Sequence, residues 1–187
     1  VFSENDFPYI VKNLNQFDII QDIIKENQTV IIGGTRKNNM KYYNTLFLIK
    51  KNGIQEYDKT KLVPFGEFLP FRKYLSLFKI IVGENDYSKG TKSRHISISN
   101  DLNIIPIICY EIVFFKNLLD KNNFKNNLLV NITNDSWFGK LSGPYQHLYI
   151  SRARAVEYNK VLVRVSNNGV SAIINSKGVF SSLIPLN

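Results

Sequence analysis

The sequence is poor in the residues that build disulfides and metal centres. It contains one cysteine and two histidines in 187 residues. A single cysteine excludes any internal disulfide framework. His95 and His147 stand far apart and lack the ligand spacing of a metal motif, so we expect no metal and no other cofactor.

Long apolar runs are lacking as well. No run of about eighteen or more apolar residues occurs, and the opening Val1–Glu4 lacks the basic and apolar regions of a signal peptide. The chain as given is therefore not expected to span a membrane. Its abrupt start, with Glu4 soon after two apolar residues, favours a fragment that is entered within a strand.

Lysines and arginines outnumber acidic residues by 24 to 15, so the net charge is +9 at neutral pH. Such a charge can attract anionic lipid headgroups or nucleic acid through forces that salt screens. The lysines are spread through the loops, as over 121–127, which is typical of a solvated surface. No basic run carries interleaved aromatic residues, so we expect no nucleic-acid partner.

The composition, with 44% hydrophobic residues, is that of one globular domain. Apolar residues three and four positions apart predict an amphipathic helix over 9–27 that packs on a sheet. A second helix is predicted over 144–158. Strands are predicted at 29–33 (ended by Gly33 and Gly34), 42–49, 54–57, 103–108, 127–132, 161–165 and 170–174, with turns at Asn52-Gly53 and 175–178, the second leading toward Phe180. The alternation predicts a layered α/β (α+β) domain with no internal boundary.

Two segments resist assignment to regular structure. Residues 58–70 contain three prolines or glycines and read as a loop, and loops of this kind often carry function. Residues 71–82 are unusually apolar for their polar surroundings. They either cap the core or form a lid exposed to lipid, and the sequence slightly favours the core.

The only cysteine closes the strand 103–108, and a helix is predicted after it from Glu111 to Leu119. Cys109 would then sit on a strand-to-helix turn near the positive end of a helix dipole, which lowers a thiol's pKa. The alternative is that Cys109 is a small buried hydrophobic residue. Pro106 is unusual in a central strand because proline cannot donate to the hydrogen-bond ladder.

Three ionisable residues, Glu4, Lys59 and Cys109, each follow a predicted strand. A cysteine nucleophile needs a base to take its proton, and a tetrahedral intermediate needs a cation or amide donors beside its oxyanion. Taken singly, the three could be a surface carboxylate, a solvated lysine and a core thiol. Taken together, they supply every role that the chemistry requires.

Four segments carry a family resemblance in their order and spacing: Tyr57–Pro70, Cys109–Ile112, Asn134–Gly139 and Ser166–Gly169. They resemble the nitrilase-type (carbon-nitrogen hydrolase) domain of bacterial apolipoprotein N-acyltransferases, over essentially the whole of 1–187. The resemblance implies a four-layer α-β-β-α sandwich, here incomplete at both ends. The segment that leads to Glu4 departs from the family pattern: Val1-Phe2-Ser3 stands where the family more usually has Trp-Pro before the glutamate.

The resemblance also implies roles for individual residues. It makes Glu4 the general base, Lys59 the cation that stabilises the intermediate and Cys109 the nucleophile, with the backbone amide after Cys109 completing the oxyanion site. The supporting and substrate-binding residues are Glu67 beside the pocket, Tyr110 and Glu111 at the turn, and Trp137 near the entrance.

The implied reaction moves a fatty acyl group from a phospholipid, through a cysteine thioester, to the N-terminal amine of a diacylglyceryl-cysteine lipoprotein. The implied partners are therefore a phospholipid donor, a lipoprotein acceptor and a membrane surface. The implied location is the bacterial inner membrane, with the catalytic domain on the periplasmic side. Phenylalanines at 65, 68, 71 and 78 and Leu75 would give the dry, lipid-facing surround.

Enzymes of this family carry membrane-spanning helices ahead of the nitrilase-like domain, and this sequence contains none. We therefore expect a partial domain with exposed sheet edges, little activity by itself and a tendency to aggregate. Two other readings stay open. The chain could be a soluble carbon-nitrogen hydrolase that cleaves amides or nitriles, or an inactive fragment that only binds lipid or partner surfaces.

Overall fold

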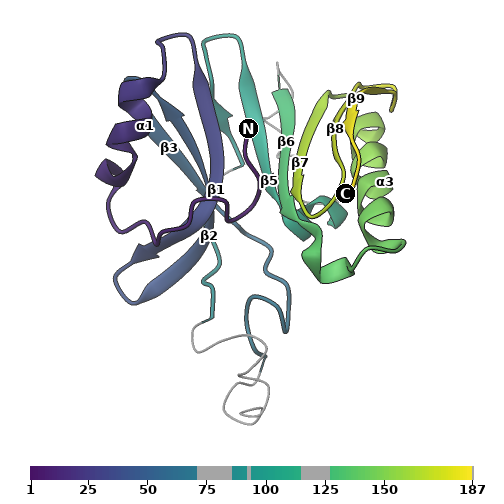
Figure 1. The fold of residues 1–187 in the computed structure, drawn as a ribbon, viewed down its shortest axis with the longest axis horizontal. Helices are drawn as coiled ribbons and strands as arrows, with labels where there is room; N and C mark the ends of the chain where they lie inside the picture. Colours follow the sequence, from purple (N-terminus) through teal and green to yellow (C-terminus); the bar gives the residue numbers. More distant parts are fainter. Residues whose placement is uncertain (71–85, 92–93, 115–126, 187) are drawn as a thin grey trace.

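The computed structural model describes residues 1–70, 86–91, 94–114 and 127–186. Its elements stack in four layers (Figure 1). Helix α1 (Asp18–Ile23) covers the sheet β1-β2-β3, which packs on the sheet β4-β5-β6-β7-β8-β9, and helix α3 (Gly143–Glu157) covers the far face of that second sheet. The expected α-β-β-α order of layers is thus confirmed.

The first sheet is an antiparallel meander of β1 (Thr29–Asn38), β2 (Lys41–Lys50) and β3 (Gly53–Asp58). Lys50 pairs with Gly53, so the predicted hairpin is present, but its two turn residues are Lys51 and Asn52 instead of the predicted Asn52 and Gly53. β1 is longer than predicted, because Gly33 and Gly34 continue the strand instead of ending it.

The second sheet is mixed. Its strands are β4 (Ile96–Ser97), β5 (Asn103–Ile108), β6 (Asn127–Asn134), β7 (Leu162–Asn167), β8 (Ser171–Ile174) and β9 (Phe180–Ile184). Only β5-β6 and β6-β7 pair in parallel, and the remaining pairs are antiparallel. The carboxyl ends of β5 and β6 consequently lie side by side, and both run into short 3₁₀ helices.

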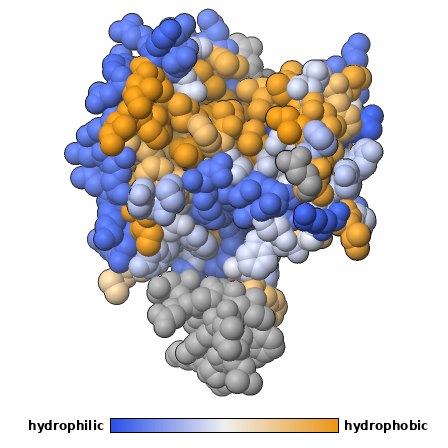
Figure 2. All heavy atoms as spheres, viewed as in Figure 1, coloured by the Kyte–Doolittle hydropathy of each residue, from blue (hydrophilic) through white to orange (hydrophobic). Residues whose placement is uncertain are grey.

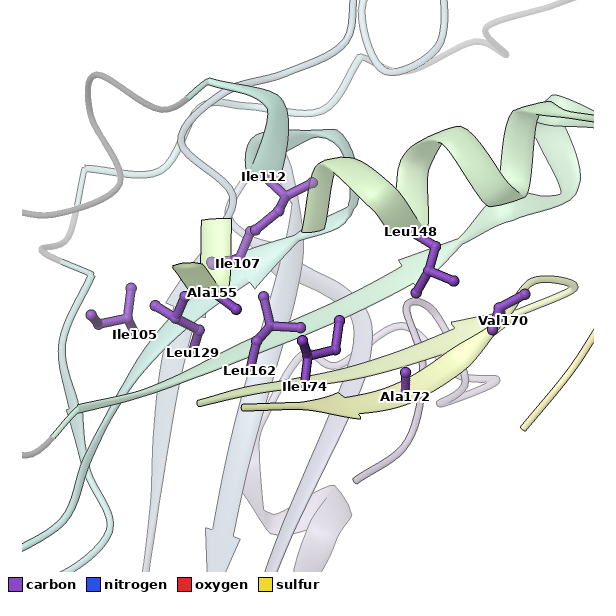
Figure 3. Packing of buried hydrophobic residues seen from close by; sticks show 10 residues of the cluster. All are labelled: Ile105, Ile107, Ile112, Leu129, Leu148, Ala155, Leu162, Val170, Ala172 and Ile174. Carbon is purple, nitrogen blue, oxygen red and sulfur yellow. The ribbon is translucent and has the colours of Figure 1, made fainter. Parts of the chain in front are cut away.

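Apolar side chains fill each of the three interlayer spaces. Between the sheets, Ile31 and Leu48 of the first pack with Ile104 and Val130 of the second. Ten residues fill the space under α3, where Leu148 and Ala155 of the helix point onto the strands (Figure 3). Burial of such side chains contributes about 1.5–3 kcal/mol each, which fixes the layers beneath the site.

The predicted helix over 9–27 is shorter in the structure. Regular turns cover only η1 (Leu14–Phe17) and α1, and Val11 instead bridges Arg36 of β1. The Asn13 side chain accepts a hydrogen bond from the Asn15 amide and starts the helical segment there. The stripe still packs on the sheet through Phe17 and neighbouring residues, as expected.

Pro106 lies within β5 and pairs in register with Val130 of β6. Its carbonyl accepts a hydrogen bond from Arg94 Nη1 at 3.4 Å, on the side of β5 away from β6. Because the N and C=O of a strand residue point to the same side, the missing N–H also faces that side. There β4 pairs only with Asn103 and Ile104, so the ladder tolerates the proline.

Apolar side chains extend across the upper part of the view in Figure 2, over strands of both sheets, with polar side chains below them. Within the described ranges, no helix has the length and hydrophobicity that a membrane crossing requires. The apolar segment 71–82, predicted as a core cap or a lid, lies outside the described residues.

Candidate active site

Cys109 is the first residue of η3 (Cys109–Val113), directly after β5. Its φ of +51° is left-handed, a conformation that costs roughly 1–3 kcal/mol for a residue with a side chain. The prediction of a helix over 111–119 is wrong where it can be followed, because the 3₁₀ turn ends at Val113 and residues 115–126 are outside the described ranges. The strained turn delivers the thiol to the floor of a cavity.

The Cys109 thiol is buried, with 8% of the residue exposed. Burial, together with the charge of Glu4, raises the pKa of Cys109 to about 12, although Lys59 opposes the change. The expectation of a lowered pKa is therefore wrong: the turn is too short to supply a strong helix dipole, and a carboxylate faces the thiol. The resting group at neutral pH is a thiol, which needs a base to become a nucleophile.

Glu4 reaches the same point from the chain's first residues, which form no strand. The segment follows the edge of β1, with hydrogen bonds from Phe2 N to Ile31 O at 2.7 Å and from Gly33 N to Ser3 O at 3.1 Å. Glu4 Oε2 accepts from the backbone N–H of Asn134 at 2.9 Å, and the carboxylate lines the same cavity as Cys109, where its charge raises the pKa of the thiol. The geometry thus places a carboxylate where a thiol proton could go.

Lys59 follows β3 and is 1% exposed. Its Nζ donates to Glu67 Oε1 at 2.9 Å and lies 3.6 Å from Glu4 Oε1. Burial alone lowers the pKa of Lys59, but the charges of Glu4, Cys109 and Glu67 outweigh burial and raise it. Lys59 is accordingly a buried ammonium beside the thiol, ready to stabilise a negative oxygen.

Glu67 comes from the irregular loop 58–70. Its Oε2 accepts from the backbone N–H of Val63 at 2.9 Å, which folds the loop onto itself. Its Oε1 faces Lys59 and the cavity. Glu67 therefore holds the ammonium together with Glu4.

The cavity above these groups has a volume of about 560 Å³. Tyr110 lines it, and its ring contacts Phe138 and His147. Trp137, 69% exposed, and Phe65, 51% exposed, stand at its mouth. The polar floor thus opens through an aromatic rim, which suits a substrate with an apolar portion.

Glu111 does not line the cavity and is fully buried. Its carboxylate accepts hydrogen bonds from the backbone amides of Thr60, Lys61 and Ile108 and forms an ion pair with Arg94 at 2.7 Å. These bonds tie the residues after Lys59 to the strand that carries the cysteine. Glu111 supports the site and is not placed to touch a substrate.

Sequence reasoning missed Asn44, Arg94 and a buried polar network behind the cysteine turn. In that network Asp135 pairs with Arg164 Nη2 at 2.6 Å and with His147 Nδ1 at 2.8 Å. A lone asparagine in a strand and an arginine among valines carry no chemical signature. The one available signal was general: a charge buried in a core is paired, so an arginine in a buried strand indicates an acidic partner.

The fourth motif, Ser166–Gly169, belongs to this network. Ser166 Oγ donates to Asp135 Oδ2 at 2.9 Å, and a Cβ on Gly169 would lie 2.2 Å from the same oxygen. Burial and Arg164 lower the pKa of His147, and for Asp135 the bond to His147 and the charge of Arg164 outweigh burial and lower the pKa. The motif therefore holds the Asp135–Phe138 turn that carries Trp137.

The carbon-nitrogen hydrolase family model matches residues 6–186, so the chain belongs to the carbon-nitrogen hydrolase family. Within that family, the chain is 38% identical to an apolipoprotein N-acyltransferase of Rickettsia typhi over 92% of its length. It is 40% identical to one of Rhizobium leguminosarum bv. trifolii over 95% of its length. It spans about a third of the length of these curated relatives, 36% and 35% respectively.

Solved structures share the fold. A CN-hydrolase superfamily protein from Xanthomonas campestris aligns with a TM-score of 0.61 at 20% identity, over 85% of this chain and 59% of that one. The glutamine-dependent NAD+ synthetase of Acinetobacter baumannii aligns with a TM-score of 0.69 at 15% identity, over 98% of this chain and 36% of that one. These similarities establish the nitrilase-type architecture.

Proposed function

We propose that this chain is the catalytic part of an enzyme that acylates the N-terminal amine of lipoproteins, through a thioester on Cys109. The observation that carries the proposal is the meeting of Glu4, Lys59 and Cys109 on the floor of one cavity. The sequence similarity to apolipoprotein N-acyltransferases supports the acyl group as cargo and a lipoprotein as acceptor.

In the first step, Glu4 takes the thiol proton as the sulfur attacks the sn-1 ester carbonyl of a phospholipid such as phosphatidylethanolamine. The negative charge on the carbonyl oxygen is stabilised by the Lys59 ammonium and the backbone N–H of Tyr110. The C–O bond of the ester then breaks, and the leaving alkoxide takes the proton from Glu4. The products are a thioester on Cys109 and a lysophospholipid.

In the second step, the α-amine of the diacylglyceryl-cysteine attacks the thioester, and Glu4 accepts a proton from the attacking nitrogen. An amide bond forms as the C–S bond breaks, and the thiolate recovers its proton from Glu4. The amine prevails over water only if the cavity stays dry. The aromatic rim of Phe65, Trp137 and Phe138 supports that requirement.

The remaining residues support this chemistry. Glu67 holds Lys59, Tyr110 and Trp137 line the path of the acyl chain, and Glu111 fixes the loop and turn behind them. The reaction places the protein at the bacterial inner membrane with this part on the periplasmic side. There the positively charged chain meets a phospholipid surface and the lipoprotein acceptor.

Thioester trapping tests the proposal. The protein as its gene encodes it is incubated with phosphatidylethanolamine vesicles, and intact mass is measured before and after hydroxylamine. We expect a long-chain adduct that hydroxylamine removes and that Cys109→Ala abolishes. An adduct that persists in Cys109→Ala would refute the assignment of Cys109 as the nucleophile.

The same assay separates the other readings. Turnover of small amides without a lipid adduct would identify a carbon-nitrogen hydrolase of the amidase or nitrilase kind. Binding to vesicles without an adduct or turnover would identify a fragment that only binds surfaces. Either result would overturn the acyltransferase proposal.

A further inference from the structure

Asn44 of β2 lies between the two carboxylates of the site and is 2% exposed. Its Nδ2 donates to Glu4 Oε1 at 2.7 Å and to Glu67 Oε1 at 2.8 Å. An amide nitrogen carries two hydrogens, so each carboxylate receives one. The backbone carbonyl of Asn44 also accepts from the N–H of Lys59 at 2.8 Å. One strand residue thus bonds to the side chains of Glu4 and Glu67 and to the backbone of Lys59.

The other end of the Asn44 side chain has a cost. Its Oδ1 is buried and has no hydrogen-bond partner among the described residues. A buried polar atom left unpaired typically costs about 1–3 kcal/mol. Packing of β2 does not require an amide here, because Leu46 and Leu48, at alternate positions of the same strand, fill the core with apolar side chains. The two bonds to the carboxylates therefore account for the amide at this position.

The charge balance explains why a neutral donor suits the position. Glu4 and Glu67 carry two negative charges and Lys59 one positive charge, so one negative charge is left over beside the Cys109 thiol. A cation at position 44 would neutralise that charge and make Glu4 a weaker proton acceptor. An amide holds the carboxylate in place by hydrogen bonding and leaves its charge available.

We propose that Asn44 is a positioning residue for acyl transfer, which holds Glu4 toward the Cys109 thiol and keeps Glu4 and Glu67 apart. The inference rests on the proposed function only in taking Glu4 as the base for Cys109. It adds a specific role: the Asn44 amide is what allows two carboxylates to share one ammonium.

The test measures how fast Cys109 is acylated by p-nitrophenyl butyrate at different pH values. This activated ester needs neither phospholipid nor lipoprotein, so it can succeed where the lipid assay fails. The variant Asn44→Asp keeps the side-chain shape but turns the donor toward Glu4 and Glu67 into a third carboxylate. The charged or titratable groups facing this cluster are Glu4, Glu67, Lys59, Cys109 and Tyr87.

We expect Asn44→Asp to shift the acid limb of the rate profile to higher pH by at least one unit, which is about a tenfold loss of rate on that limb. The reason is that three adjacent carboxylates share a proton that two did not hold. Asn44→Gln, which restores the two donors, should move the limb back toward the parent profile. An acid limb of Asn44→Asp that superimposes on the acid limb of the parent protein would overturn the proposal.

A loss of folded protein would scale the whole profile without moving its midpoint, so the midpoint separates positioning from stability. Asn131→Asp is the matched control, since Asn131 is also a fully buried strand asparagine. Its bonds go to Ile107 O, Cys109 O and Arg164, not to Glu4 or Glu67. We expect it to lower stability and leave the acid limb in place, and an equal shift in Asn131→Asp would also overturn the proposal.

Discussion

At the scale of single residues, Cys109 combines a left-handed backbone with a thiol that is hard to ionise. The sulfur shares a cavity with Glu4 and Lys59, and burial with the Glu4 charge keeps the sulfur protonated at rest. The thiolate, not the thiol, is the form of cysteine that reacts with oxidants and alkylating agents. The same environment therefore protects the resting thiol, and on the proposed mechanism it makes Cys109 dependent on Glu4 as base.

The pH dependence of the thiol follows from this environment. Because the folded pKa is about 12 against about 8.5 for an ordinary cysteine, the thiolate absorbance at 240 nm should be absent up to pH 9.5 in the folded protein. The measured quantity is the difference in absorbance between the parent protein and Cys109→Ala, because the tyrosine contribution is the same in both and cancels. The unfolded chain in guanidinium should titrate near the ordinary value.

The sign of the linked stability also follows. The contribution of the protonated thiol is fully present below about pH 8.5 and is lost as the pH rises toward 12, because the unfolded chain ionises first. A folded-state midpoint at or below pH 8.5 would contradict the burial argument.

The motifs were sufficient to name the charged residues of the site, but not their supports. Glu4, Lys59, Glu67 and Cys109 were predicted from segments that carry a family resemblance, and the structure brings them together. Asn44 and Glu4 are 40 positions apart, and their bond depends on the register of β1 with β2. No local pattern encodes such a register, so the amide was missed.

At the scale of elements, the close approach of the first residues to β1 depends on Gly33. A Cβ on Gly33 would lie 2.6 Å from Ser3 O and 2.8 Å from Glu4 Cα. Both are backbone atoms that cannot rotate away. The glycine predicted from the sequence to end a strand is instead the place where the segment that carries Glu4 lies on the sheet.

Gly33→Ala should therefore move the Glu4 carboxylate away from the thiol. Because displacements of about 1 Å can cost about 10²-fold in rate, we expect at least a tenfold slower acylation of Cys109 by p-nitrophenyl butyrate. Gly53→Ala, where an added Cβ meets nothing within 4 Å, is the control and should change the rate by less than about twofold. Equal rates in all three proteins would contradict this account of Gly33.

The network of Asp135, His147 and Arg164 joins η5, α3 and β7. Both the Asp135 and the His147 pKa are lowered in the folded state, so the unfolded chain binds more protons as the pH falls. Stability should consequently decline as the pH drops below about 6.5, where unfolded His147 charges, and decline further near pH 4.

Urea unfolding at pH 7.5 and pH 5.5 measures this loss as a lower midpoint at pH 5.5. His147→Gln should reduce the difference between the two midpoints, and His95→Gln, at an exposed position, should retain it. A midpoint that does not change between the two pH values would show that His147 is not buried as a neutral group.

Elements with a clear period were predictable, and those shaped by distant contacts were not. The hairpin β2-β3, the strands β5, β7 and β8 and the helix α3 lie where apolar spacing and turn residues put them. The helix over 9–27 was overextended because the apolar spacing could not reveal that Val11 bridges β1. The turn after Cys109 is shorter than predicted because the backbone leaves helical geometry at Phe114, with φ −87° and ψ 74°.

At the scale of the whole molecule, a sheet face turned away from α3 exposes apolar side chains. Ile173 of β8 is 42% exposed and Ile184 of β9 is 66% exposed, while Ala172 and Ile174, on either side of Ile173 in β8, pack under α3. The orange surface in Figure 2 shows how much apolar area this view contains. Exposed apolar patches of this kind favour association.

We expect this chain to self-associate at micromolar concentrations and Ile173→Lys with Ile184→Lys to shift it toward a 21.6 kDa monomer. Sedimentation velocity measures the distribution. Ile19→Lys, on exposed α1, is the control and should leave the association unchanged. An identical distribution for the double variant would show that this face does not drive association.

The opposite margin of the second sheet is blunted by Pro106. Beyond Ile104, β4 no longer covers β5, and the position that would present an N–H to an incoming strand presents a proline ring beside the Arg94 guanidinium. A foreign strand docking there would lack one rung of its ladder and would have to displace Arg94, which is buried and paired with Glu111. The second sheet is thus a poor template for strand addition from this side, and its other edge strand, β9, is the one open to such pairing.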